Sequence, residues 1–503
     1  MTPLLINGND LTFDDLRQVV YERRQVSLGA PAREKVNAAR AVVDKLLRED
    51  RVAYAINTGV GKLSDVHIEP AQNRQLQLNL IRSHASGVGE PLSQEETRAM
   101  MLLRANSLAK GFSGVRGDVI DCLCAMLNRG VHPVVPSQGS VGASGDLAPL
   151  AHLALAMIGE GEAFFENTRM SSADATRRAE IKPLVPEAKE AISLINGTQA
   201  MLAVGTLALM AADTLAETAD VLGAMTLDAL HGTDVAFDAR IHAARPHAGQ
   251  IKVATNLRRL IEGSEIRQSH KDCGRVQDAY SMRCIPQVHG AVRDTLDFCR
   301  RTFAIEMNSA VDNPLVFVKS AGEGDIISGG NFHGQPLAFA LDYMAIVLSA
   351  LAGISERRIE RLVNPALNEG LPPFLAADAG INSGFMMPQV AAAALASENK
   401  GLAHPASVDS ITTSGNKEDY VSMGMGAAIK LKKVVANTTY VLAIEACAAA
   451  QALDFLAPLK SSPALQKAHA AIRKVSATIN QDRSLAEDFV KLAELVRGGG
   501  ILK

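Results

Sequence analysis

Hydrophobic positions recur with a helical period along most of this 503-residue chain. In residues 30–47, apolar side chains such as Ala39, Val43 and Leu46 fall three or four positions apart. Pro31 stands near the start of this stretch, where its fixed φ suits the first turn of a helix. The pattern predicts an amphipathic helix.

Further helices are indicated by capping residues and by long alanine-rich runs. Ser93 and Glu96 have the spacing of a capping box before an apolar run that Gly111 closes. Residues 199–230 and 434–456 are apolar on almost every side, with widely spaced charges. Such helices belong inside a bundle of other helices.

Strand signals are few, so the fold is expected to be mainly α. Residues 162–167 and 314–318 are the two short, isolated candidates. Regular βαβ alternation is missing, which argues against a doubly wound sheet or a TIM barrel. We expect a long central helical bundle and a mixed N-terminal lobe that carries a glycine-rich loop.

A shift in composition near residue 195 suggests where the parts of the chain divide. We predict an N-terminal lobe over 1–195, a central helical bundle over 196–460 and a small C-terminal helical tail over 461–503. The uncharged run 194–212 approaches membrane-spanning length, but polar residues interrupt its first half, so it is predicted to be a buried helix.

Composition narrows the function. Lysine and arginine number 51 against 54 aspartates and glutamates, and no long run of one sign occurs, so neither nucleic acid nor a membrane is an expected partner. Aromatic residues are 4% with no tryptophan, which weakens any interpretation based on base stacking. The cysteines are scattered and no signal peptide is evident, so a cytoplasmic location is expected.

No essential metal site is expected, because the histidines lack ligand spacing. This applies to His132, His152, His242, His247, His289 and His469. Cys122 and Cys124 are two apart on a helix and point to different faces. Cys273 is a candidate either for the mouth of an active site or for a structural thiol.

The most unusual segment is Gly139-Ser-Val-Gly-Ala-Ser-Gly-Asp146, just before an apolar helical run. As a phosphate cradle it lacks the usual glycine spacing and a lysine. As a nucleophile elbow with Ser144 it lacks a preceding strand. A plain glycine-rich helix N-cap is also open.

A fourth interpretation uses the backbone of Ala143-Ser144-Gly145. The amide nitrogen of Gly145 can attack the carbonyl carbon of Ala143 and close a five-membered ring, and small residues permit the sharp bend. Loss of water from Ser144 would then leave a methylidene group conjugated to the ring. The product is an electrophile that no ordinary side chain provides.

This segment resembles the one from which aromatic amino acid ammonia-lyases form methylidene-imidazolone (MIO). Other segments match that family in order, and together they span residues 54–422. They are Tyr54-Ala-Ile-Asn-Thr-Gly, Ser83-His-Ala-Ser-Gly, Leu194-Ile-Asn-Gly-Thr-Gln, Gln277-Asp-Ala-Tyr-Ser-Met-Arg-Cys and Gly329-Gly-Asn-Phe-His. Within the family the likeness is strongest to the histidine-specific members, through stretches such as AFDARIHAARPH and PASVDSITTSGNKEDYVSMG.

The resemblance implies a role for each matching residue. The planar fork of Arg283 would hold the substrate carboxylate, helped by Asn196. Tyr54 would be the base that removes the β-proton. The matches implied beside the prosthetic group, for proton handling, hydrogen bonding and packing, are Gln277, Tyr280 and Phe332.

Specificity is implied to depend on His84 and Glu418, which would face the substrate ring. A carboxylate suits an imidazole N–H and would be poorly placed against a phenyl ring. Lys417 and Tyr420 depart from the pattern, because histidine-specific sequences commonly have glutamine and histidine there.

The function implied is elimination of ammonia from L-histidine to give trans-urocanate, with MIO formed from Ala143-Ser144-Gly145. A homotetramer with active sites shared between subunits is implied as well. Within the family the alternative is a tyrosine or phenylalanine ammonia-lyase, or an aminomutase. Outside it, the alternatives are an inactive helical binding protein and a serine hydrolase.

Overall fold

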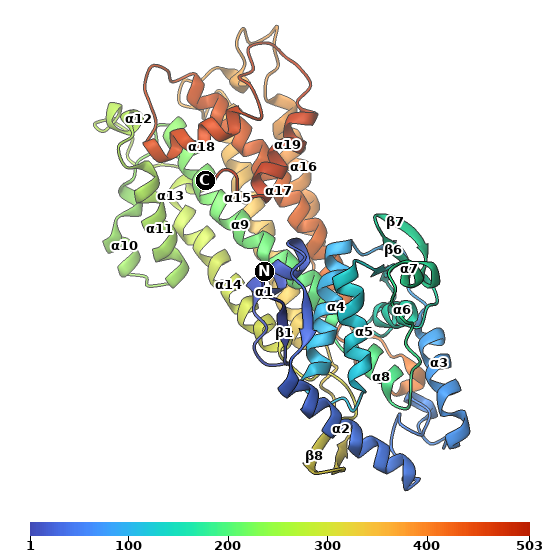
Figure 1. Cartoon of the computed structure of the whole chain (residues 1–503). Coiled ribbons are helices and arrows are strands. Elements are labelled where there is room, and N and C mark those ends of the chain that lie inside the picture. Colours follow the sequence, from blue (N-terminus) through green and yellow to red (C-terminus); the bar gives the residue numbers. More distant parts are fainter. Residues whose placement is uncertain (503) are drawn as a thin grey trace. The chain divides into compact units, whose positions relative to one another are not determined.

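The computed structural model describes residues 1–502, and these are predominantly α-helical with a few short strands (Figure 1). The chain forms two compact units, each built from segments that are distant in sequence. The first comprises Met1–Leu207, Arg300–Leu341 and Pro405–Ile429, and the second comprises Ala208–Cys299, Asp342–His404 and Lys430–Lys503. The division at residues 195 and 460 stays a prediction, whereas compactness groups the chain in this way.

Helices of the first unit surround a small core and carry most of the candidate residues. Within it α4 packs beside α1 and α5, and α3 packs beside α6 and α8. The helices of this unit are α1 (Phe13–Tyr21), α2 (Ala30–Arg48), α3 (Asn73–His84), α4 (Gln94–Ala109), α5 (Gly117–Arg129), α6 (Leu147–Met157), α7 (Ser172–Arg178) and α8 (Glu190–Ile195), with short 3₁₀ turns at Gly61–Leu63, Pro70–Gln72 and Ser414–Asn416.

The capping residues act as their spacing predicts. The Ser93 hydroxyl accepts from the Glu96 amide, and the Glu96 carboxylate accepts from the Ser93 amide, so both ends of the predicted box are formed at the start of α4. The helix predicted over 30–47 is confirmed as α2, with a proline in its first turn. Gly130 ends α5 with φ of 75°, a conformation that favours glycine.

The strands form four small sheets in the first unit. Strands β1 (Leu4–Ile6) and β2 (Val26–Leu28) pair in parallel. The antiparallel sheets join β3 (Val88–Pro91) to β5 (Pro136–Gln138), β4 (His132–Pro133) to β6 (Glu162–Phe165) and β7 (Thr168–Ser171), and β8 (Leu315–Ser320) to β9 (Glu323–Ile327). The two predicted strands are confirmed as β6 and β8, but neither is isolated, since each belongs to a hairpin.

The second unit is helical and includes the C-terminal residues. Its own helices are α10 (Ala239–Ala243), α11 (Ala248–Ile261), α12 (Glu265–Ser269), α13 (Tyr280–Arg283), α16 (Met386–Leu402), α18 (Pro463–Arg473) and α19 (Ala486–Arg497), with 3₁₀ turns at Val235–Phe237 and Pro373–Leu375. Four longer helices have residues in both units: α9 (Gln199–Ala229), α14 (Ile285–Met307), α15 (Gln335–Val363) and α17 (Gly424–Asp454).

The long apolar helices are mostly buried. Helices α9 and α15 pass a test of length and hydropathy for crossing a membrane, but 72% and 61% of their most apolar windows are buried, as in core helices of folded proteins. The run 194–212 is buried as predicted, yet it is not one helix. Its backbone breaks between α8 and α9 at Gly197, where φ is 152°.

Candidate active site

The loop formed by residues 139–146 joins β5 to α6 and bends sharply. Gly142 and Gly145 both have φ of 70°, in the left-handed region. A Cβ on Gly142 would lie 2.2 Å from the hydroxyl oxygen of Ser422, and one on Gly145 would lie 2.1 Å from the carbonyl oxygen of Gly197. Both positions therefore require glycine for conformation and for space.

Backbone groups from distant segments hold this loop. The amide of Met423 donates to the carbonyl oxygen of Val141 at 2.8 Å. The carbonyl oxygen of Gly142 accepts from the Gly334 amide at 3.2 Å and from the Ser422 hydroxyl at 3.0 Å. The bend is thus fixed by contacts that do not depend on the serine at its tip.

Asp146 anchors the other end of the loop. Its amide donates to the carbonyl oxygen of Gly197 at 2.7 Å, and its carboxylate accepts from the Met201 amide at 2.8 Å and the Ser140 hydroxyl at 3.0 Å. Complete burial raises the pKa of this carboxyl to about 6, although the amide of Met201 opposes the shift. One side chain therefore connects the loop to the first turn of α9.

Ser144 stands at the tip of the loop beside a carboxylate. Its hydroxyl donates to Glu418 Oε1 at 2.7 Å, and the Thr413 hydroxyl donates to Glu418 Oε2 at 2.7 Å. A nucleophilic serine would need a histidine or another base oriented toward it, and this arrangement does not resemble that of a serine hydrolase. Glu418 is thus fixed over the residue that the cyclisation interpretation singles out.

His84 lies close enough to Glu418 for the two to interact electrostatically. Burial lowers the pKa of His84, while the Leu80 carbonyl and the charge of Glu418 oppose this. Nδ1 lies 2.9 Å from the Leu80 carbonyl oxygen, an acceptor, so Nδ1 carries the proton. A neutral ring then leaves Nε2 as an acceptor.

Asn196 presents an unpaired polar atom in a buried position. Its side chain is 4% exposed, and its Oδ1 has no hydrogen-bond partner within residues 1–502. Arg104 fixes its backbone by donating to its carbonyl oxygen at 2.9 Å, and also donates to Gln199 Oε1 at 2.7 Å. A buried acceptor without a partner is unusual in a native protein, and a bound ligand would satisfy it.

Tyr54 and Phe332 are half-buried residues of the first unit. The Tyr54 hydroxyl oxygen accepts from the Gly61 amide at 3.1 Å, and the ring lines a cavity of about 380 Å³. Phe332 comes two residues before Gly334, whose amide contacts the loop. Both are thus on segments held near fixed backbone, and the structure records no direct contact of either ring with Ser144.

Three predicted residues form a separate group in the second unit. Gln277 and Arg283 line a cavity of about 440 Å³ together with Cys273. The Arg283 guanidinium carbon lies 4.5 Å from the ring centre of Tyr280, and Arg283 Nε is buried without a partner among the described residues. The structure therefore brings the predicted residues together as two groups.

Residues with no predicted role also shape the site. Thr413 orients Glu418 from five residues away, a separation at which the sequence offers a signal, whereas Ser422 reaches Gly142 across 280 residues. Tyr420, one of the departures from the histidine-specific pattern, stacks on His333 at 6.0 Å between ring centres. Lys417 is exposed and forms no ion pair with Glu418 in the described part of the chain.

Comparisons with known proteins agree over nearly the whole chain. The family model "Aromatic amino acid lyase" matches residues 11–474. A histidine ammonia-lyase of Koribacter versatilis is 69% identical, covering 99% of this chain and 98% of the relative. Another, from Anaeromyxobacter sp. strain K, is 53% identical over all of both chains.

Solved structures give the same result for the fold. Histidine ammonia-lyase from Trypanosoma cruzi has a TM-score of 0.92 at 42% identity, covering 99% of this chain and 94% of that one. Tyrosine aminomutase from Streptomyces globisporus has a TM-score of 0.94 at 38% identity, covering 100% and 98%. With its bent Ala143-Ser144-Gly145 loop and this likeness, the chain belongs to the aromatic amino acid lyase family.

Proposed function

We propose that this chain is an ammonia-lyase that eliminates ammonia from L-histidine and releases trans-urocanate. The observation that carries the proposal is the bent loop at Ala143-Ser144-Gly145 with the Glu418 carboxylate fixed over Ser144. The relatives named histidine ammonia-lyase, at up to 69% identity, point to the same reaction.

Ala143, Ser144 and Gly145 are the residues proposed to form MIO. Attack of the Gly145 nitrogen on the Ala143 carbonyl carbon, with loss of that oxygen as water, closes the ring, and loss of the Ser144 hydroxyl as a second water leaves the methylidene. The buried Ala143 and the left-handed Gly145 fit this group, because larger side chains would prevent the bend. Once formed, the group supplies an electrophile that helps the amino group leave.

Arg283 and Asn196 are proposed to bind the amino acid backbone of the substrate. A guanidinium can donate two parallel hydrogen bonds to a carboxylate, and the unpaired Nε of Arg283 is one available donor. Asn196 would contribute its side-chain amide, whose oxygen lacks a partner in the described chain. These contacts would hold the Cα–Cβ bond of the substrate in one orientation.

Tyr54 is the proposed base for the β-proton, and the Gly61 amide keeps its oxygen in position. Gln277 and Tyr280 are proposed to handle protons and hydrogen bonds near the amino group, and Phe332 to pack beside the reacting atoms. Their assignment rests on the family resemblance together with the placement described above.

Glu418 and His84 are proposed to select histidine. A carboxylate accepts a hydrogen bond from an imidazole N–H, and a neutral His84 offers a further acceptor at Nε2. Phenylalanine would leave both groups without partners. Selection by unpaired buried polar groups reaches about four to five orders of magnitude in other enzymes.

We also propose a cytoplasmic homotetramer whose active sites are shared between subunits. This is supported by the grouping of the candidate residues, since the cavity that holds Gln277 and Arg283 is lined by residues 233–287 alone. Neither group of candidate residues contains all the proposed chemistry by itself.

The alternative within the family is action on tyrosine, as an ammonia-lyase or an aminomutase, and the likeness to tyrosine aminomutase favours its inclusion. Product absorbance with histidine, tyrosine and phenylalanine at equal concentration distinguishes the two. Intact mass tests the prosthetic group, because the mature chain should be lighter by two waters. Ser144→Ala should fold but lose more than about a thousandfold in turnover, about 4 kcal/mol of barrier. Near-normal turnover would overturn the proposal, and faster turnover of tyrosine would replace its substrate.

A further inference from the structure

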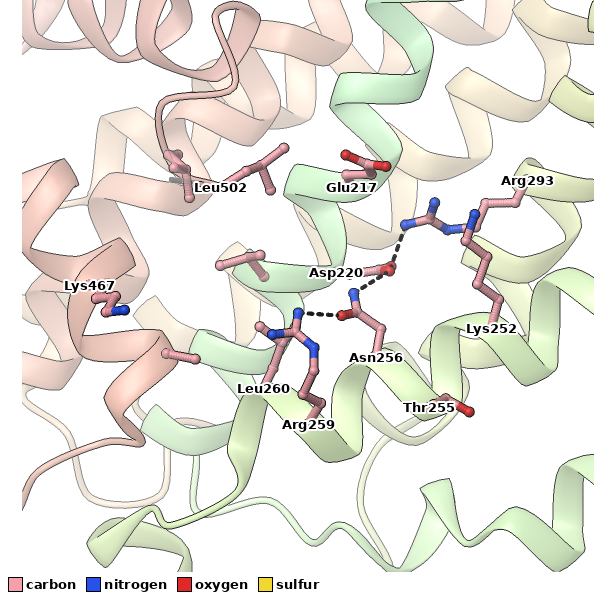
Figure 2. A pocket seen from close by; sticks show the side chains of 13 residues that line it. Glu217, Asp220, Lys252, Thr255, Asn256, Arg259, Leu260, Arg293, Lys467 and Leu502 are labelled. Atoms are coloured by element: carbon pink, nitrogen blue, oxygen red, sulfur yellow. Dashed lines mark hydrogen bonds and ion pairs between the residues drawn. The ribbon is translucent and has the colours of Figure 1, made fainter.

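A polar cavity of about 600 Å³ lies within the second unit, between residues of α9, α11, α14 and α18 (Figure 2). None of the candidate residues for the lyase reaction lines it. Its volume falls in the range that binds small molecules in other proteins. The cavity therefore calls for a function of its own.

Positive charge prevails among the lining residues. The cations are Lys252, Arg259, Arg293 and Lys467, and the two carboxylates are Glu217 and Asp220. Figure 2 shows Lys467 on one side of the space and Lys252 with Arg293 on the other. Two positive charges remain in excess on opposite walls.

Asp220 is already occupied by protein partners. Its Oδ1 accepts from His289 Nδ1 at 2.8 Å, and its Oδ2 accepts from Arg293 at 2.7 Å and from Asn256 Nδ2 at 3.1 Å. Although burial opposes it, the bond from His289 helps to lower the pKa of Asp220, and burial lowers the pKa of His289. The pair is thus an aspartate with a neutral histidine, and His289 adds no charge.

The same network prepares two of the cations. Arg293 is held by Asp220, and its Nε is buried without a partner within residues 1–502. Arg259 donates to Asn256 Oδ1 at 2.8 Å. A guanidinium that is already held loses less conformational entropy when it binds an anion.

The two lysines are available for a ligand. Neither Lys252 nor Lys467 has a hydrogen bond or ion pair to another side chain in the described structure, and the same is true of Glu217 on the rim. One carboxylate thus faces cations on both walls, too few to neutralise them. A bound anion would supply the missing charge.

We infer that this cavity binds a small molecule with at least two anionic groups, phosphates or carboxylates, spaced to reach Lys252 and Lys467 from one position. The site is independent of the proposed lyase reaction. Because the lysines are exposed, binding should weaken as salt is raised.

The test is calorimetric titration of the whole protein at constant ionic strength, with pyrophosphate and with citrate. We expect saturable binding of at least one probe, and the tighter one identifies the chemistry as phosphate or carboxylate. The double variant Lys252→Ala/Lys467→Ala should weaken binding by at least about tenfold. The matched control is Lys474→Ala/Lys491→Ala, which removes two exposed lysines outside the cavity and should bind as the parent does.

A second variant tests the sign of the charge. Glu217→Gln removes the free carboxylate of the rim and should tighten binding. The inference is overturned if neither probe binds at millimolar concentration, or if binding is the same in the cavity double variant and its control. Circular dichroism confirms that the variants are folded, so that a loss of binding reports the site.

Discussion

Replacing Gly145 with alanine would place a methyl group among backbone atoms that cannot move aside. The added Cβ would lie 2.1 Å from the carbonyl oxygen of Gly197, 2.3 Å from its carbonyl carbon and 2.8 Å from its Cα. That carbonyl is itself held by the Asp146 amide. The left-handed φ alone costs about 1–2 kcal/mol, and shifting packed backbone adds about 1–3 kcal/mol.

A matched glycine separates the two costs. Gly130 has nearly the same φ, 75°, but no atom lies within 4 Å of the place that an added Cβ would take. Gly130→Ala should therefore show only the conformational cost, and Gly145→Ala should be the less stable by about 1–3 kcal/mol. Thermal denaturation of both variants beside the parent measures the difference.

The same pair tests the prosthetic loop. Gly130→Ala should reach the mass that lacks two waters, whereas Gly145→Ala, with its bend displaced, should retain both. Mass is read on denatured protein, so even an unstable variant gives a result. Equal melting temperatures and equal masses for the two variants would refute the reasoning that close packing against Gly197 sets the bend.

Three further outcomes are expected. Arg283→Lys should raise KM and lower kcat, because a point charge cannot reproduce two parallel hydrogen bonds, and unchanged steady-state kinetics would remove Arg283 from the site. Glu418→Gln should lower turnover of histidine at least about tenfold while any trace turnover of phenylalanine holds or rises, and an equal fall on both substrates would argue for a role other than specificity. The raised pKa of Asp146, about 6 against an ordinary 3.8, contributes up to about 3 kcal/mol of stability that is fully present below pH 3.8 and is lost as pH rises through about 6. Melting curves of Asp146→Asn should thus gain on those of the parent between about pH 4 and 7, and a constant gap would contradict the assignment.

Local signals in the sequence predicted much of the helical structure. The Ser93 box, the helix after Pro31 and the apolar run of α9 each depend on residues within a few turns of one another. Short strands such as β1 (Leu4–Ile6) were not predicted, because three residues pair with a distant segment and leave no periodic pattern. The break at Gly197 was also missed, since its cause is the approach of the 139–146 loop rather than its neighbours.

The candidate site shows the same limit. The family resemblance pointed to Ser144 and Glu418 separately, and their roles remain proposals. The hydrogen bond between them, and the part of Thr413 in fixing the carboxylate, follow only from the folded chain. The polar cavity beside Asp220 has no sequence signal, because four helices contribute one or a few residues each.

The contacts of the 139–146 loop also set an order of events in the making of the protein. Ser144 and Glu418 are 274 positions apart, and the amide that holds Val141 belongs to Met423. A ribosome must have added these residues before the bend has all its supports. A growing chain therefore carries an ordinary serine at position 144, and a chain truncated before residue 418 keeps it. The reactive group, once it forms, marks a chain whose folding is already complete around it.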